Sequence, residues 1–216
     1  MTLTCIKDIA LTLAALSSIY VGLKGLSAWG RQLKGNTEYV LAKNMLTAIY
    51  KLREAIDYAR NPFLYHHPDC PADEWDKLDS KQKEWITFTE GLRKRLDKIV
   101  IAESKLKSFL IEAEVVWGVT SKEKIEPLLE MIKQYNFAMS ENYNEKLNSI
   151  FYNGGINTKE DRKEHTKILY KPMRNKDDDE YMKKLEKIIS DIENVLKPRR
   201  STGSVTVVER CTTTPA

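Results

Sequence analysis

A short segment rich in histidine, aspartate and cysteine is the first part of this sequence whose residue types could do chemistry. Its candidate residues are His66, His67, Asp69, Cys70 and Asp73. Imidazole, thiolate and carboxylate groups bind zinc, and a cysteine beside a histidine is the smallest arrangement of a nucleophile with its base. A structural zinc site needs four ligands, however, and no CxxC or HxxxH pattern elsewhere supplies the others. We therefore expect exposed polar residues in a proline-rich linker here, with no metal site.

Signatures of known catalytic sites are missing from the rest of the sequence, which contains no GxSxG, P-loop, GxGxxG or HExxH pattern. Glu103 interrupts an apolar helical stripe, and Glu112 and Glu114 flank another apolar position. Buried carboxylates can act as acids or bases. We expect instead that Glu103 lies at the edge of the core and pairs with a lysine. The prediction is a non-enzymatic protein without catalytic residues, cofactor or metal.

The composition is that of a folded helical protein. The 216 residues are 42% hydrophobic and 31% charged, and the 9 glycines and 7 prolines lie between long uninterrupted stretches. A net charge of +4 is too mild for a dedicated nucleic-acid binder, so no nucleic-acid partner is expected. The three cysteines, Cys5, Cys70 and Cys211, are far apart and odd in number, which favours a reducing compartment over a disulfide framework.

The apolar stretch from Ile9 to Gly30 is interrupted only by Lys24, and its 22 residues are long enough to cross a bilayer. Three alternatives compete: a retained membrane span, a cleaved signal peptide and a buried core helix. The segment before it carries only Lys7, beside Asp8, which is a weak start for a signal peptide. We therefore predict a single retained span from Ile9 to Gly30.

Basic residues after the apolar stretch predict the orientation of this span. Lys24 follows its uninterrupted part, Arg31, Lys34 and Lys43 follow its end, and only Lys7 precedes it. The positive-inside rule then places the bulk of the chain in the cytoplasm.

Small residues recur every four positions within the predicted span, at Ala10, Ala14, Ser18 and Gly22. Such a row lets two helices approach closely in lipid, so it is a candidate interface between spans. The alternative is that small residues are simply common in membrane helices.

Apolar residues spaced three and four apart predict the remaining elements. The longest such stripe predicts a helix from about Ser80 to Trp117 and consists of Trp85, Phe88, Leu92, Leu96, Ile99, Leu106, Leu110, Ala113 and Trp117. The fold class is all-α, a single N-terminal transmembrane helix followed by an elongated antiparallel helical bundle of about four helices. The two long helices should pair antiparallel through a turn at Gly118, residues 156–176 should form a mobile basic loop, and Pro198 should end the last helix. The predicted parts are 1–35, the transmembrane anchor; 36–60, a first cytoplasmic helix; 61–79, a Pro-rich linker; 80–197, a long helical hairpin plus a C-terminal helix; and 198–216, a disordered tail.

Two segments of the sequence resemble known proteins. "WGRQLKGNTEYVLAKNMLTAIYKLREAIDYARNPF" together with "EAEVVWG" resembles a group of uncharacterised bacterial proteins, each with an N-terminal span and a helical cytoplasmic region. The resemblance covers roughly residues 9–130. It implies the bacterial inner membrane as the location, and it implies no activity and no functional residues.

The sequence thus predicts a non-enzymatic, single-pass membrane protein whose cytoplasmic helices act as a scaffold or sensor. Its expected partners are the lipid bilayer and either further copies of itself or another membrane protein. The first alternative is a membrane-active effector or phage-defence component whose N-terminal helix inserts into the bilayer. The second alternative is a hydrolase that uses the linker from His66 to Asp73.

Overall fold

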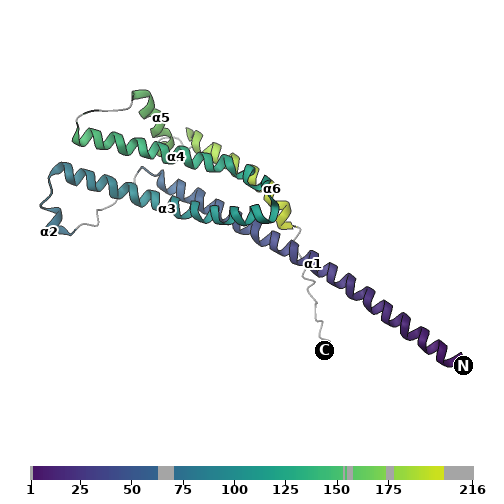
Figure 1. Cartoon of the computed structure of the whole chain (residues 1–216). Coiled ribbons are helices and arrows are strands. Elements are labelled where there is room, and N and C mark those ends of the chain that lie inside the picture. Colours follow the sequence, from purple (N-terminus) through teal and green to yellow (C-terminus); the bar gives the residue numbers. More distant parts are fainter. Residues whose placement is uncertain (1, 63–70, 153, 155–157, 174–177, 202–216) are drawn as a thin grey trace, which may run out of the picture. The chain divides into compact units, whose positions relative to one another are not determined.

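The computed structural model describes residues 2–62, 71–152, 154, 158–173 and 178–201, and these form helices joined by turns and short connections (Figure 1). The helices are α1 (Thr2–Ala59), α2 (Ala72–Trp75), α3 (Ser80–Trp117), α4 (Thr120–Phe151), α5 (Lys159–Leu169) and α6 (Glu180–Ser201). The predicted all-α class and helical bundle are therefore confirmed. The chain divides into two compact units, one of residues 1–43 with 197–216 and one of residues 44–196.

The first unit contains the N-terminal part of α1, which passes through Gly35 without a break. Its described large apolar side chains are more than half exposed from Leu11 to Leu33. The side chains of residues 2–10, 12, 14 and 15 lie outside the description, and these include Ala10 and Ala14 of the predicted span interface. Among the described residues, no helix has both the length and the apolar character that crossing a membrane requires. The predicted span from Ile9 to Gly30 is thus not confirmed.

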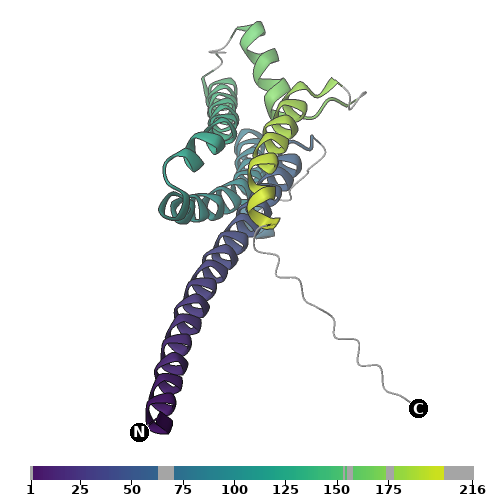
Figure 2. The same ribbon diagram turned by 90° about the vertical axis from the view of Figure 1, so that its right-hand side faces the viewer.

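The second unit is a bundle in which α3 and α4 form an antiparallel hairpin (Figures 1 and 2). Gly118 joins them with a φ of +81°, a conformation that glycine adopts without the steric cost of a Cβ. At the other end of the hairpin, the ring of Trp85 lies 5.1 Å from that of Tyr143 and 5.8 Å from that of Phe151. Aromatic contacts therefore hold the hairpin together where its helices are not joined.

The core-facing side of α3 was predicted in part correctly. Ile99, Leu106, Leu110 and Ala113 of the predicted stripe are buried. Burying one such leucine stabilises the fold by about 1.5–3 kcal/mol. Glu103 lies at the edge of this stripe and pairs with Lys107 at 2.6 Å, as the sequence predicted.

The prediction of a loop over residues 156–176 is wrong for its middle part, which forms α5. Thr158 and Asp161 make a capping box at its start, where each side chain accepts a hydrogen bond from the other residue's backbone N–H. The hydroxyl and N–H of Thr158 also stabilise the Asp161 carboxylate and lower its pKa. At the other end Leu169 is buried. One buried leucine among charged neighbours gives too weak an apolar pattern to predict a helix.

The predicted end of the last helix at Pro198 is also wrong, because α6 continues to Ser201. A proline costs a helix the hydrogen bond that its own N–H would donate. So close to the C-terminal end of α6, this loss affects only the last turn.

Arg60 follows α1 directly and is completely buried. Its guanidinium donates to the Asp179 carboxylate at 2.8 Å, and to the carbonyl oxygens of Ile168 at 2.7 Å, Lys167 at 2.9 Å and Tyr170 at 3.2 Å. The three carbonyls lie at the C-terminal end of α5, where a helix has no internal donors for its last carbonyl groups. A single side chain therefore ties the end of α1 to the end of α5 and the start of α6.

The partners of Arg60 are themselves fixed. Asp179 also accepts a hydrogen bond from the backbone N–H of Met182 at 3.1 Å, which caps the first turn of α6. The Tyr181 ring lies under the guanidinium at 4.8 Å. The backbone N–H of Lys171 donates to the Arg60 carbonyl at 2.9 Å.

Replacement of Arg60 by methionine tests this anchor. Arg60→Met leaves the Asp179 carboxylate and three carbonyls without their donor, so we expect a loss of about 3–5 kcal/mol in the free energy of unfolding. Arg93→Met is the matched control, because Arg93 pairs with Glu90 and Asp97 on the surface, and we expect a change of at most about 1 kcal/mol. Urea denaturation of both variants measures this, and equal effects would contradict the anchor.

Candidate functional site

The sequence-predicted metal or catalytic cluster is not assembled by the described part of the chain. His66, His67, Asp69 and Cys70 lie outside the described residues, and Asp73 is exposed on α2. Within the described ranges, no group of three or more histidine, cysteine, aspartate or glutamate side chains is placed to hold a metal ion.

A buried polar cluster around Arg60 is the first candidate site that the structure adds. Tyr135 of α4 is fully buried beside it, and its hydroxyl has no hydrogen-bond partner among the described residues. Burial raises the pKa of the Tyr135 phenol well above its usual range, although the positive charges of Arg95 and Arg60 act in the opposite direction. Burial likewise raises the pKa of Tyr181, whose hydroxyl donates to the Met131 carbonyl at 2.9 Å. Both phenols therefore stay protonated at neutral pH, and a protonated phenol is a poor general base.

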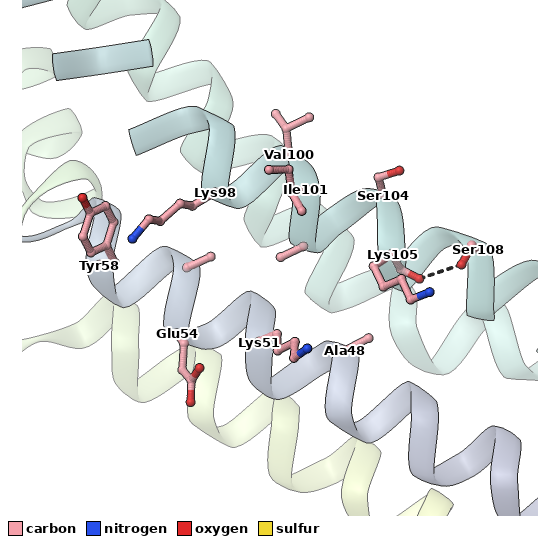
Figure 3. A pocket seen from close by; sticks show the side chains of 12 residues that line it. Ala48, Lys51, Glu54, Tyr58, Lys98, Val100, Ile101, Ser104, Lys105 and Ser108 are labelled. Carbon is pink, nitrogen blue, oxygen red and sulfur yellow. Dashed lines mark hydrogen bonds between the residues drawn. The ribbon is translucent and has the colours of Figure 1, made fainter. Parts of the chain in front are cut away.

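The second candidate is a groove of about 960 Å³ between α1 and α3, with both of its walls inside the second unit (Figure 3). Small apolar residues from both helices line it, among them Ala48, Ala55 and Ala102. Side chains this small leave space that a larger apolar group can fill.

Lysines dominate the polar lining of this groove. Lys51, Lys98 and Lys105 line it, against the single carboxylate of Glu54. Lys98 reaches across from α3 to α1, where its ammonium lies 3.4 Å from the centre of the Tyr58 ring (Figure 3). The groove is thus an apolar hollow with a positively charged margin, which suits an apolar surface that carries carboxylates.

On α3 a second helical stripe begins in the wall of the groove, where its first three residues line the groove, and we name this stripe the outer face of α3. It consists of Ile101, Ser104, Ser108, Ile111 and Val115. Ile101, Ile111 and Val115 are 71%, 66% and 83% exposed. All of these positions except Ile111 follow a buried residue of α3 by two places, which is about 200° around a helix, so they point away from the core.

Sequence reasoning missed the outer face, the groove and the Arg60 cluster, for two different reasons. The outer face has the same alternation of three and four residues that predicted the core, so its signal was present, but one stripe was assigned to α3. The groove and the Arg60 cluster gave no local signal, because each joins residues that are distant in sequence.

Comparison of the chain with protein-family models, with curated proteins and with solved structures gives no match. The fold and the groove define the chain as an all-helical bundle protein with exposed apolar surface.

A pair of tyrosine replacements separates the two buried phenols. Tyr135→Phe removes a buried hydroxyl that has no hydrogen-bond partner in the described part of the chain, so we expect the free energy of unfolding to stay unchanged or to rise by about 1 kcal/mol. Tyr181→Phe removes the hydrogen bond to Met131, so we expect a loss of about 1 kcal/mol. Denaturation midpoints of the two variants measure the difference, and a larger loss for Tyr135→Phe would contradict the assignment.

The raised pKa values also predict how stability depends on alkaline pH. Both phenols are neutral in the fold and ionise near pH 10 when unfolded, so their contribution is complete below that pH. Above it the unfolded chain loses protons that the folded chain keeps, and the free energy of unfolding falls. We expect Tyr135→Phe to reduce this fall in urea titrations between pH 8.5 and 11, whereas an identical slope in both proteins would disprove the coupling.

Proposed function

We propose that the chain is a non-enzymatic scaffold anchored in a membrane, with the N-terminal part of α1 in the bilayer and the second unit in the cytoplasm. The exposed apolar surface of α1 carries this proposal. Large apolar side chains are more than half exposed at Leu16, Ile19, Val21, Leu23 and Leu26. Four of these five lie on one side of the helix, because successive positions turn by about 100°. The other sides carry Leu11, Leu13, Tyr20 and Trp29, which are also more than half exposed, so the large apolar side chains together surround the helix.

An apolar surface on every side of a helix needs an apolar environment on every side. Monomeric soluble proteins rarely expose contiguous apolar patches of more than a few hundred Å². A bilayer surrounds a helix completely, whereas one partner helix covers only one side. Lipid is therefore the environment that fits this part of α1 best.

Lys24 and the residues after it support the proposed orientation. The ammonium of Lys24 lies 5.1 Å from the Tyr20 ring, and both side chains are of the kind that reach from apolar surroundings toward a polar interface. The basic residues Arg31 and Lys34 follow Trp29, whose type is common at membrane interfaces. A cytoplasmic second unit satisfies the positive-inside rule. The bacterial inner membrane as location rests on the family resemblance alone.

The second unit supplies the scaffold in this proposal. Its core is closed around the Arg60 anchor, whereas the outer face of α3 is exposed along several turns. Of the predicted span interface, Ser18 and Gly22 are described and exposed, and a Cβ added to Gly22 would meet no atom within 4 Å. Close approach of two spans at this position stays part of the proposal.

Extraction of the full-length chain from cell membranes tests the anchor. We expect the protein to stay in the membrane fraction in alkaline carbonate and to enter solution in detergent. Two lysines placed in the apolar segment, Leu16→Lys with Val21→Lys, should release it, because each costs about 2.5–3.5 kcal/mol at the centre of a bilayer. Val100→Lys with Phe137→Lys is the matched control in exposed positions of the second unit and should leave retention unchanged.

Two outcomes would contradict this proposal. Release of the unaltered protein by carbonate would exclude an integral anchor. Leakage of dye from lipid vesicles on addition of the purified protein would favour the effector alternative over the scaffold.

A further inference from the structure

The outer face of α3 has two halves of opposite character. Its N-terminal half contains Ile101 and the small residues Ser104 and Ser108, and Lys105 and Lys107 flank it. Its C-terminal half contains the larger side chains of Ile111 and Val115. The acidic residues Glu112 and Glu114 flank these, so this half carries the opposite charge. The division lies near the middle of the stripe, so each half has about the same length.

We propose that a second copy of this chain docks on the outer face of α3, with the two α3 helices antiparallel. The spacing of this face is that of a heptad seam, in which apolar positions of two helices meet in layers. An antiparallel register places Ser108 against Ile111 of the second copy, Ser104 against Val115 of the second copy and Ile101 against Gly118 of the second copy. Each layer then joins a large residue to a small one, as close packing requires.

The flanking charges match in the same register. Lys105 faces Glu112 of the second copy, and Lys107 faces Glu114 of the second copy. Twofold symmetry repeats both contacts, so the interface contains four pairs of oppositely charged side chains. In coiled coils these flanking positions decide partner and orientation. Lys107 also binds Glu103 in its own chain, so Lys105 with Glu112 is the cleaner pair to test.

A parallel pair of α3 helices fits less well. It would place Ser104 against Ser104 and Ser108 against Ser108, leaving those layers underfilled. It would also place Lys105 beside Val100 of the second copy, and of the four pairs of opposite charges it would keep only two, formed by Lys107 with Glu112 of the second copy. Size and charge therefore both favour the antiparallel arrangement.

The groove supports the same occupant. Lys105 lines the groove and also flanks the outer face, with its ammonium 4.8 Å from the Phe109 ring of its own helix. The groove suits an apolar surface that carries carboxylates, and residues 111–115 of a second copy are such a surface. Docking removes from water the side chains of Ile111 and Val115, which are 66% and 83% exposed in one copy.

Charge reversal with rescue tests the proposal, measured by sedimentation of the full-length chain in mild detergent. Lys105→Glu alone and Glu112→Lys alone each turn two attractive pairs into repulsive ones, so each should raise the dissociation constant of the dimer roughly tenfold, which is about 1.4 kcal/mol. The double variant Lys105→Glu with Glu112→Lys restores opposite charges and should return to within about threefold of the unaltered protein. A monomer at all concentrations, or a double variant as weak as the single ones, would overturn the proposal.

Three controls keep these outcomes distinct. Lys124→Glu makes the same charge change at an exposed position on α4 and should leave the dimer unchanged. Circular dichroism melting confirms that each variant is folded. Gly22→Ile should leave the α3 dimer intact. If Gly22→Ile abolishes the dimer and the charge reversal Lys105→Glu has no effect, association belongs to the span, and the α3 interface is overturned.

The proposal rests on the scaffold role of the second unit and not on the membrane anchor. Carbonate release of the unaltered protein with a charge-sensitive dimer would refute the anchor and leave the α3 interface standing. Firm membrane retention of a monomer would refute the interface and leave the anchor standing.

Discussion

The second unit depends on the buried guanidinium of Arg60. A buried positive charge is tolerated only when its donors are satisfied, and here one carboxylate and three backbone carbonyls accept them. The carbonyls belong to the end of α5, and the carboxylate caps α6. The position of Arg60 after α1 therefore fixes where two later helices end and begin. These contacts of Arg60 hold the end of α1 in place, and α1 and α3 form the walls of the groove.

A long helix in a small bundle has more surface than one core can cover. In α3, Ile99, Leu106 and Leu110 face the core, and Ile101, Ile111 and Val115 face away from it. Both stripes have the spacing of a helix–helix contact, so the sequence of α3 provides for two neighbours. The hairpin partner α4 packs against α3 within the chain. In our proposal a second copy lies along the outer stripe.

The parts that the sequence predicted correctly are those with a local physical cause. The repeating apolar residues of α3 and the glycine between the long helices are readable in one segment, and Glu103 with Lys107 lies within one turn. The Arg60–Asp179 pair joins residues that meet only after folding, so no local pattern contains it. Helix α5 was missed because its stability depends on a capping box, one buried leucine and donors from Arg60. For the segment from His66 to Cys70, the prediction of an unstructured linker stays a prediction.

The division of the outer face into a basic half and an acidic half has a consequence for the size of any assembly. A surface whose halves complement each other binds its own copy across a twofold axis, and such an isologous contact is closed. Both copies use the whole face in one contact, so no complementary surface of this kind is left for a third. Growth into filaments requires two different surfaces that fit each other, and a self-complementary face does not provide them. The charge pattern of one helix would thus limit this contact to pairs.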